Sequence, residues 1–163
     1  MATTLKPLFA NSANITCTIG GLAASATVGR SSAAIDNTSN LYDDALVTVQ
    51  IKTGTGAPGG DKAVYVFVYG SEDGTNYEQE ESNSPASDAG YTINSPTIFK
   101  QAASLPVLTA AKTYLKVFTV AKFFGGVLPR KWGIIVVNNA GQALDATEGN
   151  HLKQYTGINW QQV

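Results

Sequence analysis

The sequence predicts an all-β fold, either an antiparallel β-sandwich or a jelly-roll-like barrel, with an extended N-terminal arm. Extended segments recur between glycine-rich or polar turns, and no apolar stripe with a helical period lasts beyond one or two turns. The segments at 45–51 and 63–69 carry apolar side chains on both faces of a strand. A sheet with one solvated face alternates apolar and polar residues, so these strands predict cover on both sides. Other strands or other subunits can supply that cover.

The length of 163 residues fits one domain. Residues 1–14 are small, polar and aperiodic and are expected to form a flexible arm, which leaves residues 15–163 as a single β domain. Charged residues make up 14% of the chain and the net charge is -1, so we expect neither nucleic acid nor a membrane as partner. We also expect no export signal, because the N-terminus lacks an apolar core of the required length. A nearly neutral surface favours self-association.

The first half of the domain contains the two strongest strands. Residues 15–30, rich in Thr, Ala and Gly, predict two short strands around a Gly-Gly pair, and the polar residues 31–40 predict turns. The strand at 45–51 follows. Residues 53–60 include four glycines and a proline, too flexible for a tight hairpin, and predict a mobile solvent-facing loop before the strand at 63–69.

A polar excursion is predicted after the second strong strand. The Asp-Gly pair at 73–74 supplies the positive φ of a tight turn, and Tyr77 resumes an extended segment. A connection rich in Ser, Asn and Pro follows, which we expect to lie outside the fold. Its acidic side chains are Glu78, Glu80, Glu81 and Asp88.

The remaining strands are expected in the second half. Two short strands flank Pro96, and the later ones are longer and separated by turns with Gly, Pro or Asn. The segment at 113–120 is again apolar on both faces, with Lys116 as its one charge. The predicted ranges are 91–93, 97–103, 113–120, 132–137 and 152–158.

No residue pattern indicates catalysis, and we expect no enzyme, no cofactor and no metal. Cys17 is the one cysteine, which excludes an intrachain disulfide and a cysteine-based zinc site. The one histidine, His151, has no second nitrogen or sulfur ligand in its pattern and no G-x-S-x-G serine elbow to serve, so a hydrogen-bonding or interface role is favoured. The loop at 53–60 lacks the Gly-Lys-Ser/Thr ending of a phosphate cradle.

Charged groups near turns suggest alternatives that the sequence favours less. A glycosidase needs two carboxylates on rigid elements in a cleft, and a calcium loop needs a dense alternation of Asp and Asn. A solvated acidic loop explains the following residues better: Glu72, Asp73, Glu78, Glu80 and Glu81. Arg130 and Lys131, beside Trp132, are only two positive charges in a nearly neutral chain, and they give little attraction for nucleic acid.

Aromatic residues on the predicted strands are the candidate interface. Tyrosines and phenylalanines near the Asp-Gly turn suit either subunit packing or a platform on which a sugar stacks, and packing is the favoured interpretation. The candidates are Tyr65, Phe67, Tyr69, Tyr77, Tyr114, Phe118 and Trp132.

Four segments resemble a family of small structural proteins encoded by tailed bacteriophages. They are residues 63–77 (AVYVFVYGSEDGTNY), 124–134 (FGGVLPRKWGI), 36–47 (DNTSNLYDDALV) and 144–151 (LDATEGNH). The resemblance extends from about Leu22 to Tyr155 and leaves out the arm. It implies a component of the virion, and it brings no catalytic residues with it.

The expected function is therefore that of a non-enzymatic virion protein, a capsid decoration or cement protein that acts through oligomeric packing. The expected partners are copies of the chain itself, in a homo-oligomer such as a trimer, and other virion proteins such as the major capsid protein. Its expected location is the virion, assembled in the cytoplasm of the bacterial host. Two alternatives stay open at this point: a tail adaptor, collar or fibre-base component, and a carbohydrate-binding module for host-surface glycans.

Overall fold

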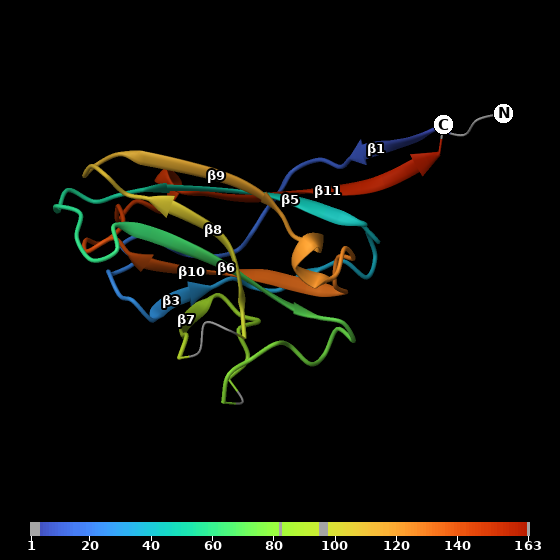
Figure 1. Ribbon diagram of the computed structural model, residues 1–163, viewed down its shortest axis with the longest axis horizontal. Coiled ribbons are helices and arrows are strands. Elements are labelled where there is room, and N and C mark those ends of the chain that lie inside the picture. Colours follow the sequence, from blue (N-terminus) through green and yellow to red (C-terminus); the bar gives the residue numbers. More distant parts are fainter. Residues whose placement is uncertain (1–3, 82, 95–97, 163) are drawn as a thin grey trace.

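Two antiparallel β-sheets stack face to face in the computed structural model, which describes residues 4–81, 83–94 and 98–162 (Figure 1). This arrangement confirms the predicted all-β sandwich. Helical structure in these ranges is limited to two short 3-10 turns, η1 (Ala121–Phe124) and η2 (Glu148–Asn150). No helix in the described ranges has the length and apolar character needed to cross a membrane.

The first sheet, sheet A, has the strand order β1-β11-β5-β9, and β2 pairs with β11 on the same side as β1. Its strands are β1 (Leu5–Phe9), β2 (Ala13–Asn14), β5 (Asp44–Lys52), β9 (Thr113–Thr119) and β11 (Leu152–Gln162). The expected strands at 45–51, 113–120 and 152–158 are all present here. The described part of the predicted arm, from residue 4 to 14, runs along β11 as an edge strand, and residues 1–3 lie outside the described ranges.

The second sheet, sheet B, has the strand order β7-β3-β10-β6-β8, and β4 also pairs with β10. Its strands are β3 (Val28–Ser31), β4 (Ile35–Asp36), β6 (Ala63–Ser71), β7 (Ala89–Thr92), β8 (Lys100–Pro106) and β10 (Lys131–Asn139). The short strand expected at 97–103 corresponds to β8, which begins at Lys100. Residue 97, the first of the expected strand, lies outside the described ranges. β5 and β6, adjacent in sequence, belong to opposite sheets, so the glycine-rich loop between them crosses from one sheet to the other.

Cover on both faces is found at β6 and β10, which pair over nine residues in the middle of sheet B. On the inner face, Val64, Val66 and Trp132 join the core between the sheets. On the outer face, Phe67 and Ile135 belong to a second core. The double-sided burial predicted for 63–69 is thus confirmed, and both covers come from the same subunit.

The polar excursion supplies the outer cover of sheet B, which corrects the expectation that it lies outside the fold. Tyr77 of the excursion packs edge to face on Tyr69 of β6, with the ring centroids 6.0 Å apart. Tyr91 of β7 packs in the same way on Phe99, just before β8, at 5.6 Å. Glu80, expected to be solvated, is 5% exposed, and its carboxylate accepts the Asn94 N–H at 2.7 Å. The acidic pattern gave no sign that Tyr77 and Glu80 turn back onto the sheet.

Sheet A is covered on one face only, which corrects the prediction for two of its strands. In β5 the residues Ala45, Val47, Val49 and Ile51 are fully buried, and those that alternate with them are half-exposed. In β9 only Phe118 is buried, whereas Leu115 and Val117 face solvent. The described residues therefore leave the outward apolar residues of 45–51 and 113–120 wholly or partly exposed.

Gly133 in β10 provides a test of the close packing in sheet B. It lies opposite Tyr69, and a Cβ atom there would overlap the Tyr69 hydroxyl group and approach Ser32 Oγ to 2.6 Å. We expect Gly133→Ala to lower the free energy of unfolding by about 1–3 kcal/mol through overpacking. Urea denaturation of Gly90→Ala is the control, because a Cβ at Gly90 meets nothing within 4 Å. Equal stability of Gly133→Ala and the wild type would contradict this packing.

Candidate interaction surface

Four of the seven aromatic residues predicted to form an interface belong to the core of the subunit. Phe67, Tyr69, Phe118 and Trp132 are at most 7% exposed. Trp132 packs edge to face on Tyr155 at 5.4 Å between ring centroids, inside the sandwich. These side chains leave almost no area for a partner, because the second sheet and the polar excursion already cover them.

The other three predicted interface residues are half-buried and hold nearby backbone or side chains. The Tyr114 hydroxyl accepts the N–H groups of Leu108 and Thr109, at 3.0 and 2.9 Å. The Tyr65 hydroxyl donates to Asp61 at 3.2 Å, and Tyr77 packs against Tyr69. Tyr65 and Tyr77 lie at the border of the second core, and Tyr114 lies at the border of the core between the sheets.

Asp73 uses its carboxylate to close the Asp-Gly turn. It accepts the N–H groups of Asn76 and Thr75 at 2.7 and 2.8 Å, together with bonds from the side chains of Asn76 and Ser71. The backbone bond from Asn76 is the largest of the effects that hold the pKa of Asp73 well below its usual range. Gly74 has the positive φ, 79°, that the turn requires. The predicted turn is confirmed, and its acidic group has a structural role.

His151 is 7% exposed and bridges two backbone segments. Its Nδ1 accepts the Lys52 N–H at 3.2 Å, and its Nε2 lies 2.9 Å from the Asp145 carbonyl oxygen. The hydrogen-bonding role favoured by the sequence matches this geometry. No group of three or more His, Cys, Asp or Glu side chains in the described ranges is arranged to hold a metal.

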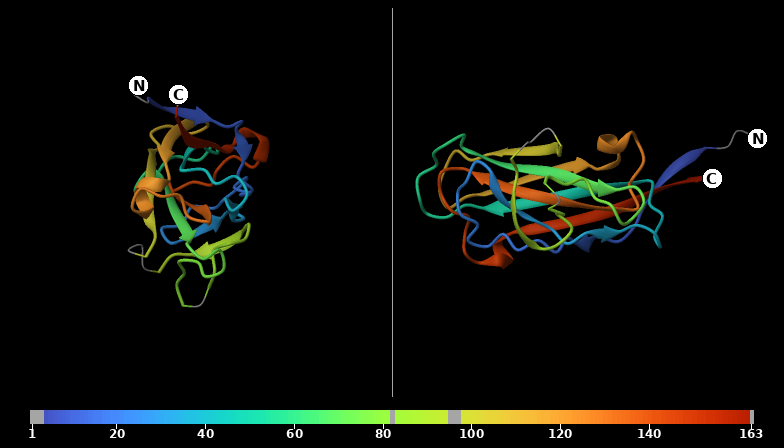
Figure 2. Two further views of the ribbon diagram at one scale, coloured as in Figure 1. Left: turned by 90° about the vertical axis from the view of Figure 1, so that its right-hand side faces the viewer. Right: turned by 90° about the horizontal axis from the view of Figure 1, so that it is seen from below.

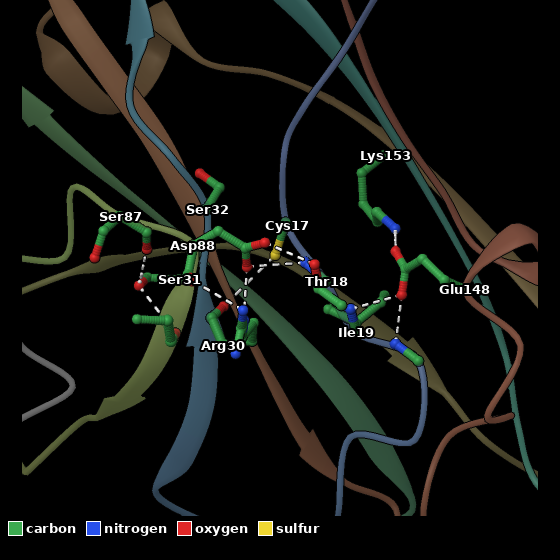
Figure 3. A network of polar contacts seen from close by, with 12 residues as sticks. Cys17, Thr18, Ile19, Arg30, Ser31, Ser32, Ser87, Asp88, Glu148 and Lys153 are labelled. Atoms are coloured by element: carbon green, nitrogen blue, oxygen red, sulfur yellow. Dashed lines mark hydrogen bonds and ion pairs between the residues drawn. The ribbon is translucent and has the colours of Figure 1, made fainter.

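A polar clamp holds residues 15–20 across the open side between the two sheets (Figure 3). From the side of sheet B, Asp88 accepts the Thr18 N–H at 2.9 Å and the Arg30 Nε–H at 2.6 Å. From the η2 turn next to sheet A, Glu148 accepts the Ile19 N–H at 2.9 Å and pairs with Lys153. One short segment thereby ties both sheets together.

The clamped segment is extended and alternates like a strand, although it joins neither sheet's ladder. Ile15, Cys17 and Ile19 point into the core and are at most 3% exposed, whereas Thr16 and Thr18 face outward. Burial raises the pKa of the Cys17 thiol to about 12, so the thiol stays protonated at neutral pH. The two short strands predicted within 15–30 are replaced by this segment and by β3.

The outer face of sheet A is left uncovered by the described residues, and its middle rows carry no charge. In register across β9, β5 and β11, its residues form three rows. These rows, called the sheet A face below, are Leu115–Gln50–Leu152, Val117–Thr48–Gln154 and Thr119–Leu46–Thr156. The charged residues at the two ends of β5 are engaged within the subunit: Asp44 accepts the Ala121 N–H at 2.7 Å, and Lys52 pairs with Asp145 at 3.2 Å.

A two-stranded ribbon extends this face beyond the sandwich. β1 pairs with the end of β11 from Leu5↔Gln162 to Phe9↔Ile158, and Figures 1 and 2 show this pair projecting past the ends of both sheets. Because side chains alternate along β11, Trp160 points to the same side as the sheet A face. Its neighbours on that side are Leu5, Pro7 and Phe9, and the side chains of Leu5, Phe9 and Trp160 are each more than half exposed.

Comparison with known proteins yields no relative: no family model, curated protein or solved structure matches this chain. The physical features therefore define the class of molecule. It is a β-sandwich whose polar groups mainly hold backbone segments in place, and which leaves an uncharged sheet face and an apolar ribbon open to contact. Sequence reasoning missed the ribbon because the strand at 5–9 has no strong apolar alternation, and only its partner β11 defines it.

The clamp predicts a pH-dependent contribution to stability. Burial acts to raise the pKa of Asp88, but hydrogen bonds from Arg30 and Thr18 outweigh it and lower the pKa to about 2. A carboxyl group with a depressed pKa in the folded state stabilises the fold above its unfolded pKa, about 4, and loses this contribution as pH falls toward 2.

Asp88→Asn should therefore be less stable than the wild type by about 1–2 kcal/mol at pH 7. The difference should shrink between about pH 4 and pH 2, as the wild-type carboxyl group takes up its proton. Urea denaturation of both proteins at several pH values measures it. A difference that stays constant down to pH 2 would contradict the assigned role of the Asp88 charge.

Proposed function

We propose that this protein is a non-enzymatic structural subunit of a tailed-bacteriophage particle, which decorates or cements the capsid by packing against copies of itself and against other particle proteins. The observation that carries the proposal is the uncharged sheet A face, continued by the apolar ribbon. The ribbon exposes more than half of Leu5, Phe9 and Trp160, and an exposed apolar patch of this kind usually marks an interaction site. The resemblance of four sequence segments to phage structural proteins supports the choice of the virion.

The polar groups of the subunit support a structural role over a catalytic one. Asp73 closes a turn, Asp88 and Glu148 hold the clamp, and His151 bridges two backbone segments. A catalytic group must instead be free to contact a substrate in a cleft. Each of these side chains forms hydrogen bonds within the fold.

A decoration protein on the capsid should be present in many copies. We expect quantitative mass spectrometry of purified particles to find this chain on the order of hundreds of copies per particle, in fixed ratio to the major capsid protein, as a symmetric shell requires. A tail protein of the same particle serves as the low-copy reference. About six to a dozen copies, the number typical of cyclic tail rings, would place the chain in the tail adaptor, collar or fibre base instead. Its absence from particles would overturn the proposal.

Glycan binding is the second candidate, favoured by a groove of about 390 Å³ beside the Asp-Gly turn. Tyr77 and Phe124 line it together with Asp73 and Asn76, a mixture of aromatic and polar groups that suits a sugar. The aromatic faces are partly used, since the Lys100 ammonium group lies 4.9 Å from the Phe124 ring centroid. This occupancy favours packing over sugar recognition.

We expect a glycan array to remain blank at high protein concentration. Should any glycan bind in this groove, Tyr77→Ala must weaken the binding, because it removes an aromatic ring on which a sugar would stack. Tyr114→Ala, a tyrosine distant in sequence and outside the groove lining, is the control. Binding that depends on Tyr77 and not on Tyr114 would establish the glycan role.

A further inference from the structure

The ribbon and the sheet A face hold most of the exposed apolar surface of the subunit. Eleven large apolar side chains are exposed in the described ranges, and six of them lie on these two features. They are Leu5, Leu8, Phe9 and Trp160 on the ribbon and Leu115 and Val117 on the face. A two-stranded ribbon alone is at best marginally stable in water, so this one gains most from a surface that covers it.

The free edge of the ribbon is unsuited to adding another strand. The Trp160 N–H donates to Asp43 at 2.8 Å, away from β1, so the cross-strand pair Pro7–Trp160 is a non-hydrogen-bonded pair. The Pro7 nitrogen consequently faces the free edge, where it has no N–H to donate. Proline at this position interrupts pairing with a further strand. The apolar face of the ribbon is therefore better suited to contact than its free edge.

We propose that the apolar face of the ribbon, formed by Leu5, Pro7, Phe9 and Trp160, packs onto the sheet A face of a neighbouring copy, along Leu115 and Val117. This inference rests on the proposed function and names the partner of its surface as a second copy of this chain. The ribbon residues on this face and the three rows of the sheet A face carry no charge. The residues in contact would therefore bring no charge against another charge, whereas a strongly charged partner would gain nothing from them. The charges of Asp43, Asp44 and Lys122 lie beside Trp160, outside the two named surfaces.

The exposed area is sufficient for such a contact. The apolar residues of the ribbon expose on the order of 400 Å², estimated from the size of their side chains, and Leu115 and Val117 on the sheet A face expose about half as much. The uncharged polar residues of the three rows supply much of the remaining area of a standard interface, which is about 800 Å² per partner. The contact joins two different surfaces, and each copy carries both. Such a head-to-tail contact forms a closed ring when its rotation closes, which fits a cyclic oligomer such as the expected trimer.

Complementary variants test this contact in the full chain by size-exclusion chromatography with light scattering. Trp160→Lys disables the ribbon, and Val117→Lys disables the sheet A face. We expect the wild type to be oligomeric and each variant alone to be monomeric. An equimolar mixture should form a dimer, because the ribbon of the Val117→Lys chain is intact and fits the intact face of the Trp160→Lys chain.

Leu108→Lys is the matched control, since Leu108 is 76% exposed but lies outside both surfaces, and it should keep the wild-type mass. Phe9→Lys is a second ribbon variant in case Trp160→Lys unfolds, which circular dichroism will show. A monomeric wild type, variants that remain oligomeric, or a mixture that stays monomeric would each overturn this contact. The particle measurement is independent: a monomer found in particles leaves the proposed function standing, and a ribbon-dependent oligomer absent from particles overturns the proposed function alone.

Discussion

The pairing of β6 with β10, buried on both faces, is the constraint on which the rest of the structure depends. Nine cross-strand pairs place this ladder in the middle of sheet B, and each of its faces requires its own apolar cover. Sheet A covers the inner face, and Tyr77 of the excursion, together with Tyr91 of β7 and Phe99 before β8, packs on the outer one. Sheet A buries the face that it turns toward sheet B, and its outer face remains open. The exposed outer face of sheet A therefore follows from the way in which the core of the subunit is covered.

The sequence predicted the strands of the core better than their cover. Alternating valines and aromatic residues at 63–69 and a dense apolar run at 132–137 predict buried strands in any arrangement, because their period is local. The same reasoning failed for 113–120: Leu115 and Val117 are as apolar as buried residues, and nothing in their spacing tells which sheet edge they occupy. It also failed for Glu80, whose burial depends on the Asn94 N–H, fourteen residues away.

The sequence predicted the character of the candidate surface but not its position. Low charge indicated a molecule that associates, and the apolar aromatic residues were natural candidates for the contact. Four of those residues instead fill the core, because large aromatic groups remove the most apolar area from water when they are buried. The ribbon and the clamp depend on partners far away in the chain, and Glu148 lies 129 residues from the backbone it holds at Ile19. Such pairings depend on the topology of the fold, which the local spacing of residues along the sequence does not reveal.

The place of β11 in sheet A has a consequence for the order of folding. This strand, the last in the chain, lies between β1 and β5, so the N-terminal strand has no partner until β11 has been synthesised. Pairing between segments so distant in sequence is slow to form, and the N-terminal segment must wait unpaired on the ribosome. A chain that stops before β11 lacks the ribbon altogether. In the contact proposed above, an incompletely synthesised subunit would lack the ribbon and could not join finished subunits through it.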